Sequence, residues 1–394
     1  MSLEIDTLKQ LLHDEVDQLE DMAVRRRLQY LLVCSTPERR EQLAASFVKV
    51  VSNYLKENEL DDAQILGEVD QDRVTGHLKE LEEDGITRLG PLLSIQQAAA
   101  IRDHLTTCPV WGGGTVNAGE SSGWETISEA RKKYGQCSHK LNDLIDAPHL
   151  LELMVSPLVL SLARRYLGAP PTIFSPNLFW SFPVAKKISA GQAVHRDWDG
   201  FRHLALFVYL VDVNKENGAH QYLRKSHTLD SIDEVLLKQK GQGDVPSKSD
   251  LFYYHFDDQF PGNERFLSLF SDETLCLEGV AGEAFLIDPF GLHRGLPLLK
   301  NERLLFWTRY SLYHNGNAVD VSKSLIPVKD VSRRIPNDRL HRYMLRTFIE
   351  SEFSVLSESS LHLPSLFLMD PPPRMNQIKK RRKLGFLRDL FFPK

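Results

Sequence analysis

The stretch AVHRDWDGF, residues 193–201, places a histidine, an arginine and two aspartates between apolar runs. At the end of a β-strand, side chains two residues apart point to the same face, so His195 and Asp197 converge while Arg196 points away. A converging imidazole nitrogen and carboxylate oxygen can chelate a divalent metal. The alternative is a solvated, charged strand end, and Asp199 is expected only to cap the turn. Such a pair is weak evidence for a metal site until a third ligand is found.

His293 is the third candidate ligand, in GEAFLIDPFGLHRGLP, where a predicted strand over residues 284–288 ends in a short turn. Ten residues later, in NERLLFWTRY, Arg303 adds a cation on the next strand, with Arg309 as its rival. Two histidines and one carboxylate leave three positions of an octahedral metal open, the geometry of non-haem Fe(II) oxygenases. Zinc hydrolases use similar ligands but do not need a buried, fork-shaped cation beside the metal.

The elements that must position these residues are short strands that begin after Pro170. The runs are rich in β-branched and aromatic residues and are bounded by Gly, Pro, Asn and Asp. They read NLFWSFP, HLALFVYLVDV, ETLCLEGV, GEAFLID and RLLFWTRYSLY. Short strands without regular helices between them favour a sandwich or barrel over a parallel sheet. Residues 228–274 interrupt the strands as a polar insert, which is predicted to be either a lid or a tolerated surface loop.

Helices are predicted before the strands. Residues 1–73 form a helical extension in which apolar residues recur every three or four positions, and Thr36 and Pro37 begin its second helix. This extension is expected to pack on the main domain, and the alternative is a pair of helices that dock a partner. Ser94 and Gln97 are predicted to form a capping box at the start of a later helix. Between this helix and the strands, residues 106–147 are expected to form an irregular loop with one short helix.

The C-terminal region, residues 317–394, combines a predicted helix with a basic, aromatic tail. Residues 374–394 hold eight basic residues and one acidic residue. Such a tail suits an anionic membrane surface or an acidic partner, or is simply solvated. No nucleic-acid reader module accompanies it, so nucleic-acid binding is not expected. The chain is thus expected to divide into the extension, a domain over residues 74–316 that contains the insert, and this C-terminal region.

Composition narrows the class of protein. The 394 residues are 42% hydrophobic and 26% charged with a net charge of −5, typical of a soluble globular protein and not of a general polyanion binder. The four cysteines show no CxxC spacing, which argues against a thiolate zinc site and fits a reducing compartment. An acidic, amphipathic N-terminus is neither a signal nor a transit peptide. A cytoplasmic location is therefore expected, with peripheral membrane contact through the tail, and the oligomeric state stays undetermined.

The motifs and their spacing resemble those of the phytanoyl-CoA dioxygenase family of Fe(II)/2-oxoglutarate oxygenases, over roughly residues 76–313. The matching pieces are LEEDGITRLGPLLSIQQAAAIRDHL, AVHRDWD, NGAHQYLRKSHT and GVAGEAFLIDPFGLHRGLPLLKNERLLFWTRYSLY, of which the last is the most specific. Two positions depart from the family pattern. Lys225 replaces a usual glycine, and Gly295 replaces a small hydroxyl residue of many relatives, which removes one contact to 2-oxoglutarate.

The resemblance implies a mainly β core with flanking helices (α+β), namely a double-stranded β-helix of the jelly-roll or cupin-like kind with helical N- and C-terminal extensions. It also implies that His195, Asp197 and His293 bind Fe(II), and that Arg303 receives the far carboxylate of 2-oxoglutarate. A guanidinium suits that role because it binds a carboxylate in a bidentate fork and keeps its proton. The implied co-substrate is O₂, and ascorbate is a further candidate cofactor.

Trp180 and Gln192 lie near the HxD motif and are predicted to line the cofactor pocket. The alternative for each is packing in the barrel core. His220 and His227 are expected to be turn residues or residues that support the site.

The activity implied by the resemblance is hydroxylation of an unactivated C–H bond in a small or lipid-linked metabolite, with decarboxylation of 2-oxoglutarate to succinate. Asp197 favours hydroxylation over halogenation, because related halogenases lack this carboxylate and bind chloride in its place. Two alternatives stay open. One is a non-catalytic barrel that binds a metabolite or partner, and the other is a different metal-dependent enzyme, such as an isomerase or hydrolase, on the same scaffold.

Overall fold

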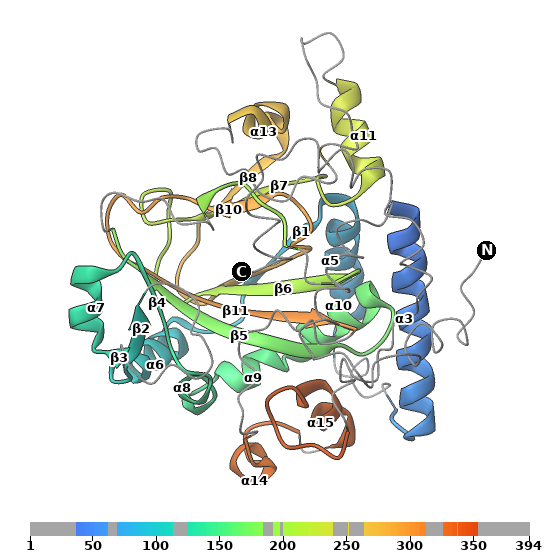
Figure 1. Cartoon of the computed structure of the whole chain (residues 1–394), viewed down its shortest axis with the longest axis horizontal. Helices are drawn as coiled ribbons and strands as arrows, with labels where there is room; N and C mark the ends of the chain where they lie inside the picture. Colours follow the sequence, from blue (N-terminus) through green and yellow to red (C-terminus); the bar gives the residue numbers. More distant parts are fainter. Residues whose placement is uncertain are drawn as a thin grey trace, which may run out of the picture.

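The computed structural model of the chain has two antiparallel sheets that lie one above the other, with helices over the outer face of the larger sheet (Figure 1). The structure describes residues 37–61, 69–112, 124–183, 192–197, 200–238, 251, 264–312, 326–336 and 338–353. The predicted class, a mainly antiparallel sheet with helices, is confirmed.

The larger sheet has eight strands in the order β1-β9-β6-β11-β5-β4-β2-β3. Their bounds are β1 Ile86–Pro91, β9 Glu283–Ile287, β6 His203–Tyr209, β11 Arg303–Ser311, β5 Thr172–Ser181, β4 Gln136–Ser138, β2 Val110–Gly112 and β3 Trp124–Glu125. The smaller sheet has the order β10-β7-β8, with bounds β10 His293–Gly295, β7 His220–Leu223 and β8 Thr274–Leu277. Each of the five strand runs expected from the sequence overlaps one of these strands, namely β5, β6, β8, β9 and β11.

Most of the helices lie along the larger sheet, whereas α11 and α13 lie beside the smaller one (Figure 1). The bounds of the helices are α3 Pro37–Glu57, α5 Gln71–Asp84, α6 Ile95–Thr106, α7 Ile127–Lys133, α8 Leu141–Asp146, α9 Leu150–Met154, α10 Pro157–Leu167, α11 Leu229–Lys238, α13 Glu264–Leu269, α14 Val328–Val331 and α15 Arg339–Leu345, with a 3-10 turn η2 at Ser271–Glu273. The capping box of Ser94 and Gln97 is confirmed at the start of α6. Gly85 ends α5 with φ 78°, a left-handed conformation that glycine adopts without strain.

The core has two parts because the larger sheet is covered on both faces. All seven residues of β6 are buried. Leu204, Leu206 and Val208 pack toward the helices, whereas Phe207 and Tyr209 pack between the sheets. This two-sided burial explains why the run HLALFVY is apolar throughout instead of alternating.

Helix α3 packs against the main body of the molecule. Its apolar side chains Leu43, Phe47 and Val51 are at most 2% exposed, and the Phe47 ring stacks on Phe201 with centroids 5.6 Å apart. The apolar face of this helix is therefore used internally and is not free to dock a partner. Residues 1–36 lie outside the described part of the chain.

Two regions differ from the expected irregular segments. Residues 106–147 contain the short strands β2, β3 and β4, which extend the larger sheet beyond the edge of β5. Strands of two or three residues are too short to show the alternation of apolar and polar residues by which a strand is predicted from a sequence. The described part of the 228–274 insert contains α11, α13 and η2, so it is not simply an irregular loop.

The tail, residues 374–394, lies outside the described residues, and its contact with a membrane stays a prediction. None of the helices that the structure describes combines the length and apolar composition that a bilayer crossing requires.

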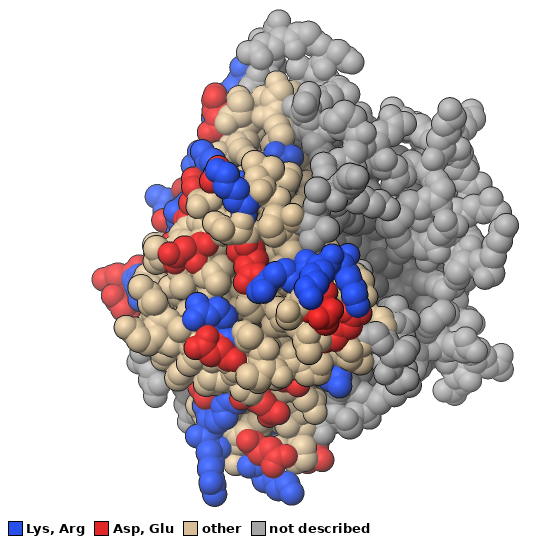
Figure 2. All heavy atoms as spheres, turned by 90° about the vertical axis from the view of Figure 1, so that its left-hand side faces the viewer, with Lys and Arg blue, Asp and Glu red and all other residues tan. Residues whose placement is uncertain are grey.

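The surface around α7 carries charges of both signs. Seen from this side, Lys and Arg side chains stand beside Asp and Glu (Figure 2). Arg131 pairs with Glu302 at 2.8 Å, and Lys133 pairs with Glu125 at 2.8 Å. Because both pairs are at the surface, where water screens the charges, we expect each to contribute little to the stability of the fold.

Candidate metal centre

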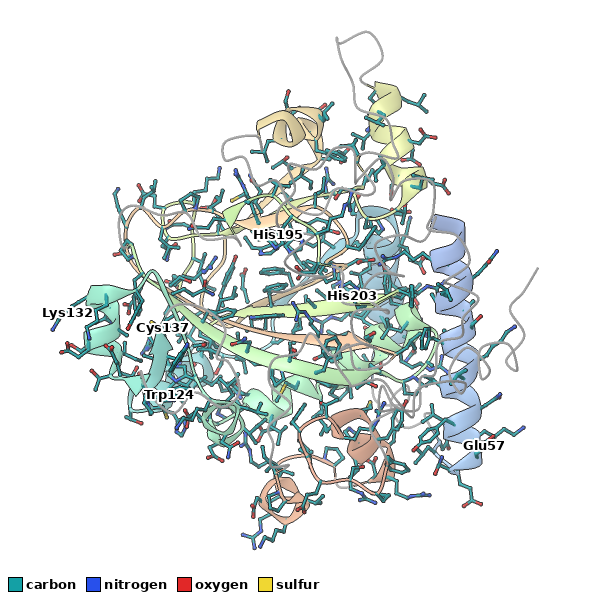
Figure 3. The ribbon with its side chains drawn as sticks, viewed as in Figure 1. Glu57, Trp124, Lys132, Cys137, His195 and His203 are labelled. Atoms are coloured by element: carbon teal, nitrogen blue, oxygen red, sulfur yellow. The ribbon has the colours of Figure 1, made fainter. Side chains whose placement is uncertain are left out.

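The segments that carry the three predicted ligands are joined through their backbones. His195 and His293 exchange two reciprocal N–H···O=C hydrogen bonds of 3.0 Å, and the Asp197 N–H donates to the Pro289 carbonyl at 2.9 Å. His195 lies between the two sheets (Figure 3). It forms an isolated bridge to β10 instead of ending a regular strand, and this bridge adds the HxD segment to the edge of the smaller sheet.

The three side chains converge as predicted. His195 Nε2 lies 3.7 Å from Asp197 Oδ1, and His293 Nε2 lies 3.9 Å from Asp197 Oδ2. One ligand atom from each residue lies within 4.8 Å of the others. Ligand atoms that share one ion at about 2.1 Å are at most about 4.2 Å apart. Adjacent positions of an octahedral ion are about 3 Å apart at this bond length, so the three ligand atoms would close in by about 1 Å on binding one ion.

Hydrogen bonds set the tautomer of both histidines. His195 Nδ1 lies 2.8 Å from the Ala193 carbonyl, and His293 Nδ1 lies 2.8 Å from the Gly291 carbonyl. A carbonyl oxygen only accepts, so each Nδ1 carries the proton and donates it. Each Nε2 is left with a lone pair that faces Asp197, the arrangement that metal-binding histidines use.

Electrostatics keep the donor set in its metal-binding protonation state. Burial, reinforced by the neighbouring His195 imidazole, lowers the pKa of His293 to about 4. Burial alone would raise the pKa of Asp197, but the Arg309 guanidinium and the two imidazoles hold it below its usual range. At neutral pH His293 is therefore uncharged and Asp197 is ionised, as metal coordination requires.

Two buried arginines brace the ligand segments. Arg196, between the two HxD ligands, is fully buried and donates to the carbonyls of Ser226, Phe290 and Leu251. Arg40 of α3 donates to the carbonyl of Gly200 at 2.9 Å and to that of Phe201 at 3.2 Å. Both guanidinium groups lie over the ring of Phe290, at 3.7 Å for Arg40 and 4.9 Å for Arg196.

The spacing in the sequence predicts that Arg196 points away from the ligands, but nothing in it indicates that Arg196 and Arg40 brace the ligand segments. Arg40 lies 160 residues from the backbone carbonyl that it binds, so no local pattern could reveal the contact.

Arg303 is a half-buried cation whose hydrogen-bond partners among the described residues are uncharged. Its guanidinium donates to the Gly218 carbonyl and, at 3.3 Å, to the Ser181 hydroxyl. Nε has no hydrogen-bond partner among the described residues, and no carboxylate in that part of the chain pairs with the side chain. Burial lowers the pKa of Arg303 from its usual value. An unpaired buried charge is costly, and an anionic ligand would compensate it.

Arg309 lies on the same face of β11 but already has an anionic partner. Its Nη2 lies 3.4 Å from Asp197 Oδ2, and its guanidinium lies 4.1 Å from the centroid of the Trp307 ring. The geometry therefore favours Arg303 over Arg309 as the group that receives a ligand carboxylate.

Trp180 requires a correction, because the structure places it away from the triad. The register pairs Arg303 with Ser181, so Trp180 points to the opposite face of β5. There its Nε1–H donates to His139 at 3.0 Å, and its ring stacks on Phe182. The alternative, core packing, is the correct one. Gln192 is half-buried three residues before His195, and its predicted contact with a cofactor stays a prediction.

Aromatic rings line the face of the larger sheet that is turned toward the triad. Phe207 stacks on Phe285 with centroids 5.2 Å apart and on Trp307 at 6.2 Å, and Trp307 stacks on Phe179 at 6.0 Å. These rings come from four adjacent strands, and the sequence analysis did not identify them as a unit. They make the floor of the site apolar.

A family model described as Phytanoyl-CoA dioxygenase (PhyH) matches residues 81–297, more than half of the chain. The chain belongs to the phytanoyl-CoA dioxygenase family. The match contains His195, Asp197 and His293, whereas Arg303 lies just beyond it. No curated protein matches the chain.

Several solved structures are similar to this family member. The non-heme alpha ketoglutarate dependent carbocyclase SnoK from nogalamycin biosynthesis is 15% identical with a TM-score of 0.35, over 60% of this chain and 82% of that chain. The epimerase SnoN in complex with Fe3+, alpha ketoglutarate and nogalamycin RO is 18% identical with a TM-score of 0.39, over 61% and 84%. EvdO2 from Micromonospora carbonacea var. aurantiaca, complexed with 2-oxoglutarate, is 16% identical with a TM-score of 0.38, over 62% and 91%.

Proposed function

We propose that this protein is an Fe(II)- and 2-oxoglutarate-dependent dioxygenase that hydroxylates an unactivated C–H bond of a small or lipid-linked metabolite. The observation that carries the proposal is a half-buried guanidinium, Arg303, that has no carboxylate partner among the described residues and shares a site with two imidazoles and one carboxylate. A zinc hydrolase would not need this cation. A non-catalytic binding barrel would need neither the cation nor three converging ligands.

The residues fit the two cofactors in different ways. His195, Asp197 and His293 would hold Fe(II) and leave adjacent positions open for a 2-oxo acid and O₂. Arg303, with the Ser181 hydroxyl beside it, would bind the far carboxylate of 2-oxoglutarate. Bound together, the cofactors supply the oxidation, in which R–H, O₂ and 2-oxoglutarate yield R–OH, succinate and CO₂.

The chain's own contribution to the reaction is orientation and shielding. The Nδ1–H bonds of the two histidines fix their rings, and the braces Arg40 and Arg196 fix the backbone that carries the ligands. The aromatic floor excludes water from the space between the sheets, which protects a reactive site from side reactions. Asp197 occupies the position that a halide would need, so hydroxylation is favoured over halogenation.

We also propose that the two sheets are the halves of a double-stranded β-helix. One half is β9-β6-β11-β5, and the other is the His195 bridge followed by β10-β7-β8. In this proposal residues 74–316 form the oxygenase domain, and residues 1–73 and 317–394 are helical extensions.

The function is tested with the purified full-length protein, Fe(II) and 2-oxoglutarate. We expect slow formation of succinate without added substrate and a visible charge-transfer absorption when 2-oxoglutarate is added to the Fe(II)-loaded protein without oxygen. Absence of both signals, in protein that binds Mn(II) and unfolds cooperatively, would exclude the oxygenase assignment.

A further inference from the structure

His220 is a buried histidine near the metal site that is not one of the three predicted metal ligands. It is 4% exposed and lies on the inner face of β7. The β10–β7 register places it opposite Gly295, two residues after His293, so both imidazoles face the space between the sheets. Their rings are nearly parallel, with centroids 5.4 Å apart.

The other ring contacts of His220 leave one of its nitrogens unsatisfied. Phe207 and Phe285 lie against the imidazole with centroids 4.8 Å and 5.3 Å away, and they offer no hydrogen bond. Nε2 is buried and has no partner among the described residues. A buried polar atom without a partner costs about 1–3 kcal/mol, so such an atom needs a physical explanation.

His220 lies between the triad and Arg303. Gly218 accepts a hydrogen bond from the Arg303 guanidinium, and two residues later the His220 ring contacts His293. The backbone N–H of His220 donates to the Tyr209 hydroxyl at 3.0 Å, and Tyr209 is a near neighbour of Arg303. A 2-oxo acid that reaches from the metal to Arg303 would therefore pass this imidazole.

We infer that His220 is a binding residue for the 2-oxo acid, and that its Nε2–H donates a hydrogen bond to the far carboxylate that Arg303 holds. This inference rests on the proposed function. It assigns the carboxylate three donors, namely Arg303 and Ser181 from the larger sheet and His220 from the smaller sheet. Binding the 2-oxo acid would thus link the two sheets and would satisfy the buried nitrogen.

The test compares His220→Leu, which removes the donor, with His220→Gln, which keeps one. Anaerobic titration of Fe(II)-loaded, full-length protein with 2-oxoglutarate gives the dissociation constant. We expect His220→Leu to weaken 2-oxoglutarate binding about tenfold, and His220→Gln to stay within about threefold of the wild type. Pyruvate lacks the far carboxylate, so its weaker binding should not change in either variant.

Two controls separate a binding role from a structural one. Gln221→Leu alters the neighbouring side chain, which contacts Arg294 on the opposite face of β7, and should leave 2-oxoglutarate binding unchanged. Mn(II) affinity, measured by electron paramagnetic resonance, should be the same in all variants because the triad is intact.

The inference is overturned if His220→Leu binds 2-oxoglutarate like the wild type, or if it weakens pyruvate and 2-oxoglutarate equally. Failure of the proposed function has a different signature, since wild-type protein would then not bind 2-oxoglutarate at all.

Discussion

The two ends of strand β11 carry the same side chain in opposite electrostatic settings. Arg309 lies 3.4 Å from the Asp197 carboxylate and stacks on Trp307. Arg303 lies on the same face, and within the described part of the chain its guanidinium donates hydrogen bonds to the neutral oxygens of Gly218 and Ser181.

When a buried cation pairs with a carboxylate of the same protein, its charge is compensated before any ligand binds. A buried cation without one raises the free energy of the ligand-free protein, and an anion that binds there recovers that cost. Arg309 is therefore part of the candidate metal site itself, whereas Arg303 is a candidate binding group for an anionic ligand.

Removing the carboxylate at the Arg309 end should have the largest effect. Asp197→Ala deletes the charged ligand and leaves Arg309 close to the metal position, where its positive charge repels a cation. We expect Fe(II) or Mn(II) affinity to fall about 1,000-fold, or about 4 kcal/mol, as measured by equilibrium dialysis. His293→Ala should lose metal binding as well. Unchanged metal affinity in that variant would refute the ligand assignment.

The Arg309 end also holds a buried histidine that makes stability depend on pH. His203 pairs with Ser311 of β11, and burial lowers its pKa to about 4, below the ordinary value of 6.5. The unfolded chain therefore binds a proton at a higher pH than the folded protein does. Stability should be unaffected above pH 6.5 and fall as the pH drops from 6.5 toward 4, by up to about 3 kcal/mol.

Chemical denaturation of the metal-free protein at a series of pH values measures this effect. His203→Gln should make the profile between pH 6.5 and 4 less steep, and the remaining slope is expected from His293 and His139, whose pKa values burial also lowers to about 4. An equally steep profile in the variant would show that other groups cause the acid sensitivity.

At the other end of β11, Arg303→Ala should weaken binding of the 2-oxo acid without changing the affinity for the metal. We expect the 2-oxoglutarate concentration needed for half-maximal succinate formation to rise about 100-fold, equivalent to about 2.7 kcal/mol. Arg303→Lys should recover only part of the loss, because an ammonium cannot form the bidentate fork. Mn(II) affinity is the control, and a parallel loss of Mn(II) binding would contradict the assignment.

The smallest effect should appear in the stability of the ligand-free protein. Replacing Arg303 with methionine removes an uncompensated buried charge, so the free energy of unfolding should change by less than about 1 kcal/mol. Replacing Arg309 with methionine removes the partner of the Asp197 carboxylate and, because the pair is partly exposed, should lower the free energy of unfolding by about 1–3 kcal/mol. Denaturant titrations without metal compare the two. If Arg303→Met lowered the free energy of unfolding more than Arg309→Met does, Arg303 would have a structural role. The contrast between the two arginines would then not hold.

Much of the fold could be predicted because it follows from local chemistry. Runs such as HLALFVY and RLLFWTRYSLY predict strands from their β-branched and aromatic content, and Ser94 and Gln97 predict a helix start. The HxD spacing likewise predicts a chelating pair. The short strands β2, β3 and β4 could not be predicted, because two or three residues show no periodicity and their pairing depends on the edge of β5.

The site was predictable to the same extent. Residue type and spacing predict His195, Asp197, His293 and Arg303, and the structure brings ligand atoms of the first three within 4.8 Å of one another, while the roles of all four residues stay predictions. Trp180 was misplaced because the face of β5 that it occupies depends on its register with β11, which no spacing near the HxD motif encodes.

The sequence by itself determined the family, the strand-rich core and the residue types able to bind a metal and a 2-oxo acid, since these are properties of short segments. Only the tertiary structure decided that Arg309 pairs with Asp197 whereas Arg303 finds no carboxylate partner among the described residues. It also decided that the buried Nε2 of His220 lacks a hydrogen-bond partner there, and that Arg40 of helix α3 braces the ligand loop. The reason is that burial and hydrogen-bond partners are set by contacts between segments far apart in the chain. Arg40 and Gly200, 160 residues apart, meet only when the protein folds.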